Sequence, residues 1–374
     1  MSLSAFATCP PAFEPLLALD LARLGLTGTP EPGGVRFKGE LPEIAHANRG
    51  LRSASRVLVR LGMPFYARSF EELVERAARL PWGRFLTTST PIALRVTCHA
   101  SRLYHSDAVA ERILAALTTH FGAEPVQGVF DEDRGGDAQL IVVRLNDDEC
   151  TVSVDSSGAH LHRRGYRLAT AKAPLRETLA AAMLLSSGWD GRAPLVDPFC
   201  GSGTIPIEAA LLASGRAPNA VRPLPLVRWP CASGIDLRPE IPIETAPPET
   251  PFIVASDRNA GAMEAARANA ERAGVLRWIT FHQHSVSDAA PLPGVGWVVT
   301  NPPYGQRLDG PDLRNLYARF GAVLRERFAG WSAAVLAGDA ALIRQTRLGL
   351  TPRWSGDNGG IAVSLYQGVI NPGG

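Results

Sequence analysis

Four short apolar runs mark the second half of the chain, and each leads into polar residues. Their β-branched and aromatic side chains, bounded by turn-forming residues, are typical of buried strands. The runs cover residues 195–197, 251–257, 278–281 and 297–300. Helical stretches follow the first two runs, over residues 205–212 and 259–273. Strands that alternate with helices in this way predict an α/β fold.

The first 165 residues or so carry a different pattern. Strands are predicted over 92–98, 138–145 and 150–155, with a helix over 107–121 between the first two. In the run from Arg56 to Arg60, strand alternation places both arginines on one face and the valines on the other. A chain of 374 residues is long enough for two or three domains. The two halves therefore predict separate units.

The last of the four apolar runs leads into Asn301, Pro302, Pro303 and Tyr304. Two prolines stiffen the backbone and fix the directions of the nearby carbonyls. The Asn301 side-chain oxygen and the Pro302 carbonyl can then accept hydrogen bonds from an aromatic amine, and Tyr304 can stack on the ring that carries it. A plain strand-ending turn is the alternative, since Asn-Pro and Pro-Pro are ordinary turn signals.

Residues 195–212 indicate a strand, a glycine turn and a helix. Gly201 and Gly203 permit positive φ and close approach of a ligand, while the helix start offers unpaired N–H groups. No Gly-Lys-Ser/Thr follows, which excludes a Walker loop. Asp257 ends the second strand, where such folds hold ribose hydroxyls, although a helix N-terminal acid is the alternative. For the glycines, a tight strand-to-helix turn is the alternative.

Together the glycine turn, Asp257, Asp288 and the tetrapeptide resemble the class I S-adenosylmethionine-dependent methyltransferases over about residues 168–374. This resemblance implies a Rossmann-like fold with a mixed seven-stranded sheet, whose last strand, 361–367, runs antiparallel after a hairpin at Asn358-Gly359. It implies that Asn301, Pro302, Pro303 and Tyr304 hold a base with an exocyclic amine, either N6 of adenine or N2 of guanine. The implied cofactor residues are Pro174, Asp197, Pro198, Phe199, Cys200, Gly201, Ser202, Gly203, Thr204, Asp257, Arg258, Asp288 and Asn301.

The first half of the chain indicates which of these two bases is the target. Residues 86–167 resemble a THUMP domain, an RNA-binding module, and residues 1–85 resemble the small α+β ferredoxin-like domain that accompanies THUMP in bacteria. The chain thus resembles the bacterial THUMP-containing guanine-N2 RNA methyltransferases, with its methyltransferase domain at 168–374. The implied activity is methyl transfer from S-adenosylmethionine to N2 of a guanosine in 23S ribosomal RNA. The alternatives are methylation of guanine N2 in transfer RNA, a DNA adenine-N6 methyltransferase and a non-catalytic RNA-binding factor.

About 60 residues separate Asp197 from Asp257, whereas a simple dinucleotide fold places the acid about 20 residues beyond the glycine turn. An insertion at about 217–251 fills the gap, and its nine prolines predict a surface excursion. This insertion either contacts RNA or covers the catalytic domain, and we expect the second. Candidate phosphate contacts, with a merely solvated face as the alternative, are Arg49, Arg52, Arg56, Arg60, Arg163, Arg164 and Arg167.

Composition adds little to this interpretation. The formal net charge of +2 gives no chain-wide electrostatic signature of RNA binding, so any basic surface must be local. The five cysteines form no Cys-x-x-Cys motif, and we expect no bound metal. The N-terminus has no basic segment before an apolar core, and no apolar run reaches the length of a membrane helix. A cytoplasmic, monomeric enzyme with RNA as its partner is expected.

Overall fold

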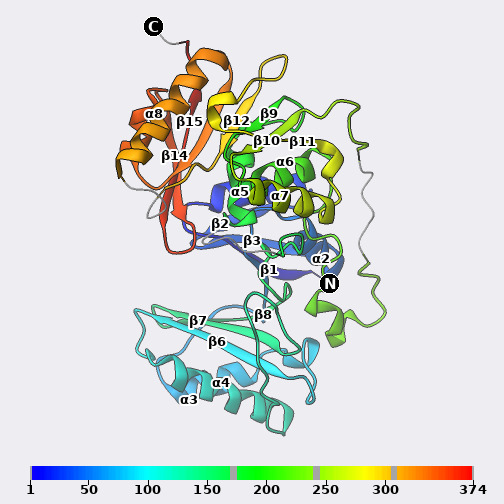
Figure 1. The fold of residues 1–374 in the computed structure, drawn as a ribbon. Helices are drawn as coiled ribbons and strands as arrows, with labels where there is room; N and C mark the ends of the chain where they lie inside the picture. Colours follow the sequence, from blue (N-terminus) through cyan, green and yellow to red (C-terminus); the bar gives the residue numbers. More distant parts are fainter. Residues whose placement is uncertain (1, 169–174, 239–244, 305–309, 373–374) are drawn as a thin grey trace. The chain divides into compact units, whose positions relative to one another are not determined.

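The structure, a computed structural model, describes residues 2–168, 175–238, 245–304 and 310–372 (Figure 1). The chain divides into two compact units. Unit 1 comprises Met1–Cys9, Leu17–Arg163 and Asn219–Glu240, and unit 2 comprises Pro10–Leu16, Arg164–Pro218 and Ile241–Gly374. Within the described ranges, no helix combines the length and the apolar character that a membrane span requires.

The described strands of unit 1 form one sheet in the order β2-β3-β1-β4-β8-β7-β6, and β5 pairs with β8 beside this path. Its strands are β1 (Leu3–Thr8), β2 (Gly28–Glu31), β3 (Gly34–Gly39), β4 (Arg56–Arg60), β5 (Phe65–Tyr66), β6 (Ile92–His99), β7 (Gln139–Asn146) and β8 (Glu149–Asp155). Its helices are α1 (Glu14–Arg23, from Leu17 on in this unit), α2 (Leu41–Gly50), α3 (Phe70–Ala78) and α4 (Ser106–Phe121). Strand β4 lies in the predicted ferredoxin-like segment, residues 1–85, and β8 in the predicted THUMP segment, residues 86–167. Because β4 pairs with β8, the two segments share this sheet.

The predicted elements of the first half are confirmed. Strands β6, β7 and β8 and helix α4 lie within a residue or so of the predicted ranges. Strands β6 and β7 are parallel, and α4 lies between them in the chain, as a parallel pair requires a crossover connection. Strands β7 and β8 are antiparallel and are joined by a tight turn through Asp147 and Asp148, both at positive φ.

Residues 219–238 of the proline-rich insertion belong to unit 1, so the expectation that the insertion covers the catalytic domain is wrong for these residues. Residues 245–251 belong to unit 2, where the Thr245 N–H donates to the Ser214 carbonyl at 3.0 Å. The buried indole of Trp229 donates its Nε1–H to Gln139 Oε1 at 2.7 Å and meets the Phe85 ring edge to face at 5.0 Å. The Arg222 guanidinium donates to the carbonyl of Ala159 at 2.8 Å. Residues 219–238 contain no strand, as the prolines predict, and they include the short 3₁₀ helices Pro225–Arg228 and Pro230–Ala232.

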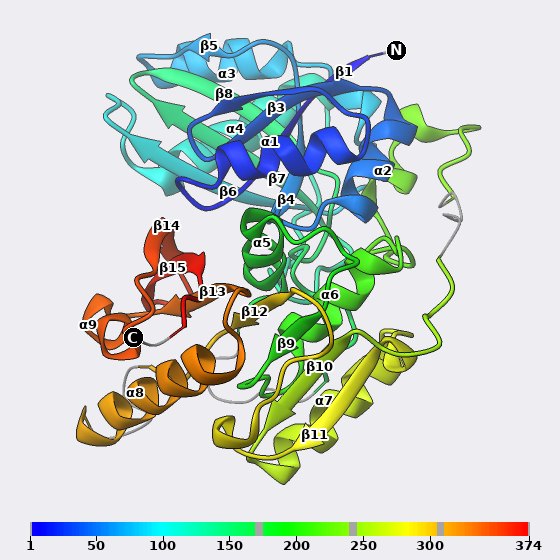
Figure 2. The same ribbon diagram turned by 90° about the horizontal axis from the view of Figure 1, so that it is seen from above.

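Unit 2 contains a mixed seven-stranded sheet in the order β11-β10-β9-β12-β13-β15-β14, which confirms the predicted class I fold (Figure 2). The described strands are β9 (Leu195–Asp197), β10 (Ile253–Asp257), β11 (Ile279–Gln283), β12 (Trp297–Thr300), β13 (Ser332–Ala337), β14 (Thr351–Asp357) and β15 (Ala362–Val369). The described helices are α5 (Glu177–Ser187), α6 (Thr204–Ala213), α7 (Ala260–Arg272), α8 (Gly310–Arg327) and α9 (Ala340–Thr346). Strand β15 is antiparallel to β13 and β14, and the predicted hairpin at Asn358-Gly359 is confirmed.

Helix α8 buries one side against this sheet. Leu313, Tyr317, Phe320 and Leu324 recur at the spacing of one helical face and are each at most 5% exposed. They form a core with Val298 and other residues of β9, β12 and β13, and the Phe199 ring meets Phe320 at 5.4 Å. This packing fixes the sheet under the segments that follow β9 and β12.

Candidate active site

The carboxyl ends of β9, β10 and β12 lie side by side, because β9 is the parallel neighbour of both other strands. Ala255 pairs with Asp197 in β10–β9, and Val298 pairs with Val196 in β12–β9. Strand β11 extends the parallel set beyond β10. The glycine turn, Asp257 and Asn301 therefore start from the same edge of the sheet, as the sequence predicts.

The glycine turn has the backbone geometry that its sequence predicts. Gly201 and Gly203 have φ of 52° and 86°. A Cβ added at Gly201 would meet no heavy atom within 4 Å, whereas one at Gly203 would lie 3.0 Å from the Ala266 Cβ of α7. Gly203 is the residue before α6 and donates its N–H to the Cys200 carbonyl at 2.8 Å. The turn thus combines a tightly packed glycine with one beside open space.

Asp197 links the turn to β12. Its Oδ1 accepts hydrogen bonds from Thr300 Oγ1 at 2.6 Å and from the Phe199 N–H at 3.2 Å. Its Oδ2 is buried and has no hydrogen-bond partner among the described residues. Burial raises the pKa of this carboxyl to about 7, the nearby Asp257 carboxylate adds to the rise, and the two hydrogen bonds oppose it.

Asp257 closes the turn from β10. Its Oδ2 accepts from the Gly201 N–H at 3.1 Å, and its Oδ1 accepts from the Asn259 N–H at 2.9 Å. Each carboxylate oxygen keeps a further lone pair that can accept from a hydroxyl. Arg258 is exposed. Asp288, also exposed, ends a short 3₁₀ helix after β11, and its Oδ2 accepts from Ser285 Oγ at 3.1 Å.

The tetrapeptide after β12 presents an unsatisfied acceptor. Asn301 is half-buried, and its Oδ1 is buried with no hydrogen-bond partner in the described ranges. The Pro303 carbonyl accepts from the Tyr317 hydroxyl at 3.3 Å, and the Tyr304 hydroxyl accepts from Asn358 Nδ2 at 2.9 Å. A buried carbonyl oxygen without a donor costs free energy, so Asn301 Oδ1 is suited to accept a hydrogen bond from a bound donor.

Several of the other predicted cofactor residues are buried. Pro198, Cys200 and Thr204 are buried, and Phe199 and Ser202 are half-buried. Burial raises the pKa of the Cys200 thiol, and its Sγ lies 3.7 Å from Met263 Sδ, which suits a packing residue. Pro174 lies outside the described residues. No group of three or more His, Cys, Asp or Glu in the part of the chain that the structure describes could hold a metal ion.

Three residues of this site carry no signal in the sequence. The sequence predicts Thr300 only as the end of a strand and Asn358 only as a turn residue, and Tyr317 belongs to the apolar stripe of a helix. Their partners lie 103, 14 and 54 positions away in the chain. A strand order derived from the resemblance could have placed Thr300 beside Asp197.

The predicted arginines of unit 1 have internal partners. Arg56 is buried and contacts Asp155, Glu132 and the Gly158 carbonyl. Arg60 donates to Glu31 at 2.7 Å, and Arg49 donates to the Leu237 carbonyl at 2.7 Å. The exposed Arg163 pairs with Asp133. Arg52 is buried. These contacts make Arg56 a structural residue, because a buried guanidinium held by two carboxylates cannot reach phosphate.

The two predicted arginines of unit 2 form buried ion pairs. Arg164 Nε lies 3.3 Å from Glu208 Oε1, with neither side chain exposed, and the Tyr166 hydroxyl donates to the same oxygen at 3.1 Å. Arg167 pairs with Glu177, whose pKa is raised by burial against the opposing effect of the arginine. The prediction that Arg164 contacts phosphate is therefore wrong. The Arg167 side chain is mostly buried.

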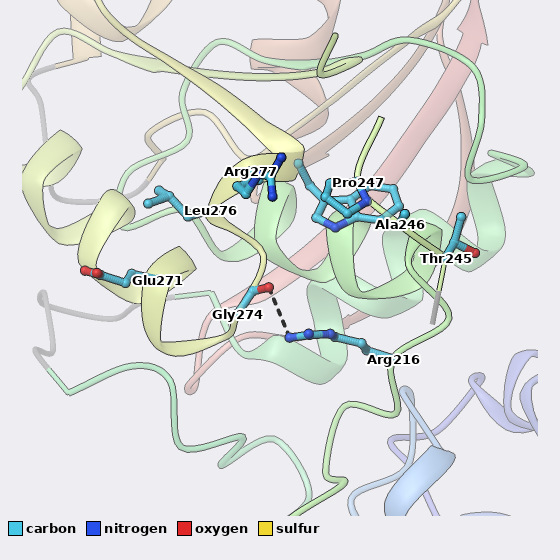
Figure 3. Close-up of a pocket in the computed structure, with 9 residues that line it drawn as sticks. Arg216, Thr245, Ala246, Pro247, Glu271, Gly274, Leu276 and Arg277 are labelled. Atoms are coloured by element: carbon cyan, nitrogen blue, oxygen red, sulfur yellow. Dashed lines mark hydrogen bonds between the residues drawn. The ribbon is translucent and has the colours of Figure 1, made fainter. Parts of the chain in front are cut away.

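A cavity of about 440 Å³ lies in unit 2 at the amino ends of the sheet's strands, opposite the carboxyl ends that carry the candidate active site (Figure 3). Its lining includes Leu276 and Trp278, which directly precede β11 and so mark the amino ends of the strands. Arg216 Nη1 donates to the Gly274 carbonyl at 3.0 Å on its wall. Among the described residues that line this cavity, none is predicted to bind cofactor or base, so the cavity is separate from the candidate active site.

Comparison with known proteins agrees with this geometry. Residues 164–353 match the family model of the RMKL-like methyltransferase domain, and residues 4–58 match that of the RlmL ferredoxin-like domain. The ribosomal RNA large subunit methyltransferase K/L of Syntrophotalea carbinolica is 36% identical over 91% of this chain and 50% of its own length. The chain spans about half the length of the K/L relatives it matches.

Two solved structures superpose over the whole chain. A predicted N6-adenine-specific DNA methylase from Listeria monocytogenes is 33% identical, with a TM-score of 0.82 over 100% of this chain and 97% of its own. A candidate methyltransferase complexed with SAH is 28% identical, with a TM-score of 0.81 over 100% of this chain and 99% of its own.

Proposed function

Because the chain belongs to the RMKL-like methyltransferase family, we propose that it transfers a methyl group from S-adenosylmethionine to N2 of a guanosine in 23S ribosomal RNA. The observation that carries this proposal is the buried Oδ1 of Asn301, which has no hydrogen-bond partner within the described ranges and stands next to two prolines and Tyr304 at a strand end. Such an oxygen is suited to accept from an exocyclic amine. The K/L names of the relatives support ribosomal RNA as the substrate class.

The residues at the carboxyl ends of β9 and β10 fit the cofactor. Gly201 leaves open space beside its backbone, and Asp257 keeps lone pairs for ribose hydroxyls. The SAH bound to a structural relative supports the same ligand class. When bound, S-adenosylmethionine supplies a methyl carbon that its sulfonium makes electrophilic. Asp197–Thr204 would hold its methionine part, Asp257 the ribose and Asp288 the adenine amine.

The protein's part in the reaction is to hold the amine. Asn301 Oδ1 and the Pro302 carbonyl accept hydrogen bonds from the two N–H groups of the amine. These bonds leave the nitrogen lone pair free to face the methyl carbon. With the cofactor bound, an N–C bond would replace the S–C bond, and the amine nitrogen held by Asn301 would then lose its proton to water. Positioning accounts for most of the rate in such a step, and no carboxylate need act as a base. The target base must leave its stack to reach this site.

RNA binding belongs to unit 1 in this proposal. We take residues 86–167 as a THUMP domain after the ferredoxin-like residues 4–58. The side chain of Arg163 is 40% exposed despite its contact with Asp133, and it remains the phosphate-contact candidate among the predicted arginines. Substitution of Arg163 should weaken binding to all RNA sequences alike, because phosphate contacts carry no sequence information.

One assay tests the function. The protein is incubated with methyl-labelled S-adenosylmethionine and, separately, with total RNA, large ribosomal subunits, transfer RNA or DNA, and the product nucleoside is identified by mass spectrometry. We expect N2-methylguanosine in 23S ribosomal RNA. N2-methylguanosine in transfer RNA alone would overturn ribosomal RNA as the substrate. N6-methyladenine in DNA would show that the enzyme methylates adenine N6 instead of guanine N2. No transfer to any nucleic acid would overturn the proposal as a whole.

A further inference from the structure

Three side-chain hydrogen bonds fix the segment that carries the tetrapeptide. Thr300 Oγ1 donates to Asp197 in β9, the Tyr317 hydroxyl of α8 donates to the Pro303 carbonyl, and Asn358 donates to the Tyr304 hydroxyl. The first two hold the backbone at the strand end and at the second proline. The third holds a side chain, and its donor comes from the turn between β14 and β15.

Asn358 is built into that turn more firmly than a hairpin requires. The side chain is 2% exposed, and its backbone N–H donates to the Ile361 carbonyl at 2.9 Å. Its Nδ2 donates to the Tyr304 hydroxyl, whereas its Oδ1 is buried with no hydrogen-bond partner among the described residues. An exposed asparagine would suffice for a turn. Burying a half-satisfied amide costs stability, which points to a second role.

The Tyr304 ring is confined on more than one side. The residue is 8% exposed, and Gly338 after β13 leaves room for it, since a Cβ there would lie 3.3 Å from the ring's Cδ2. With its edge against Gly338 and its hydroxyl held by Asn358, the ring has little freedom about either side-chain torsion. A ring that is fixed before the substrate arrives loses less entropy when a base stacks on it.

We propose that Asn358 is a positioning residue for the reaction, which acts by holding the Tyr304 ring in the orientation that receives the target base. This inference rests on the proposed function, because it takes Tyr304 as the residue on which the base stacks. The hairpin formed by β14 and β15 then serves the active site directly, through one amide, as well as completing the sheet.

A double-mutant cycle tests the proposal. Asn358→Ala and Tyr304→Phe each remove one partner of the same hydrogen bond. We expect Asn358→Ala to lower the turnover number at saturating RNA about three- to tenfold, as for loss of one hydrogen bond. The dissociation constant for S-adenosylmethionine should stay within about twofold. The double variant should be no slower than Tyr304→Phe alone, because the two changes remove one interaction.

Ser355→Ala is the matched control, since it removes the Ser355–Ser364 hydrogen bond of the same hairpin, 2.7 Å long and exposed, without touching Tyr304. Its turnover should equal that of the wild type. An equal loss in Ser355→Ala would mean that hairpin stability alone matters. Independent, multiplying losses in the double variant, or unchanged turnover in Asn358→Ala, would equally overturn the proposal.

A readout without substrate separates this idea from the proposed function. In protein labelled with 3-fluorotyrosine, the ¹⁹F resonance of residue 304 can be assigned by its absence in Tyr304→Phe. We expect this resonance to shift or broaden in Asn358→Ala and to stay unchanged in Ser355→Ala. An unchanged resonance in Asn358→Ala would overturn the positioning role even if no nucleic acid were methylated.

Discussion

Asn301 is the residue on which the proposed chemistry depends most. Its buried Oδ1 has no donor among the described residues, and the two prolines after it fix its direction. We predict that Asn301→Ala lowers the single-turnover rate of methyl transfer about 10²–10³-fold, as for loss of one preorganised polar contact. Affinity for S-adenosylmethionine, measured by calorimetry, should change much less.

Asn301→Asp is the matched control for that prediction. The aspartate keeps an acceptor oxygen at the same position, so we expect it to lose less activity than the alanine variant. Single-turnover rates for both variants, measured with the RNA that the wild type methylates, provide the comparison. An alanine variant with the wild-type rate would remove Asn301 from the mechanism.

Asp197 makes folding stability depend on pH. Its pKa is about 7 in the folded protein against an ordinary value of 3.8. Between these values the unfolded chain loses its proton while the folded protein keeps it, so this residue's contribution to stability falls as the pH rises from about 4 to about 7. Asp197→Asn cannot ionise. Its melting temperature, relative to the wild type, should therefore be higher at pH 8 than at pH 5, and a difference independent of pH would contradict this.

At the level of residues, the sequence predicts groups whose chemistry is local. The glycines and the tetrapeptide could be found because their conformational limits depend on neighbours in the chain. The bond between Asp197 and Thr300 does not follow from neighbours in the chain, because it spans 103 positions; only the strand order that the resemblance implies could have placed the two residues together. The prediction of phosphate contact was wrong for Arg56 and Arg164 for a related reason. The partners of Arg56 lie 76 and 99 positions away and that of Arg164 lies 44 positions away, so the sequence does not show that both guanidinium groups are held internally.

The strand–turn–helix element around Gly201 and Gly203 yields a prediction with its own control. Both residues have positive φ, so alanine strains the backbone at either position. At Gly203 the new Cβ would also press on Ala266 and Ile207, whereas at Gly201 it enters open space. We predict that Gly203→Ala costs about 2–4 kcal/mol and Gly201→Ala about 1 kcal/mol. Urea unfolding measures both, and equal losses would mean that packing against α7 contributes nothing.

Elements with strong periodicity were predictable, and those without it were not. Strand β12 and helix α4 follow from their apolar patterns, and the Asn358-Gly359 turn placed the last hairpin. The prolines of the insertion excluded helix and central strand, which the structure confirms for 219–238. The prolines do not show against which part of the protein these residues pack. That packing depends on residues such as Gln139, which is 90 positions from Trp229.

The chain crosses between its two units more often than two consecutive domains would require. The described part of Asn219–Glu240 leaves the methyltransferase-like unit and completes unit 1, after which the chain returns. Sequence boundaries at single positions, such as 167/168, miss this exchange, since a boundary in sequence assumes that each unit is continuous. The stability of unit 1 should consequently depend on residues encoded within the second half of the chain.

Trp229 makes that dependence measurable in the full-length protein. Its ring is 2% exposed, donates to Gln139 and packs on Phe85. Trp229→Ala should cost about 3–5 kcal/mol, as for other buried aromatic truncations. Hydrogen–deuterium exchange should speed up in β7 and β8 while β9 to β12 keep their protection, and S-adenosylmethionine should still bind. Val227→Ala, in the same segment but 54% exposed, should change neither unit. Faster exchange in β9 to β12 alone would show that the segment supports unit 2 instead.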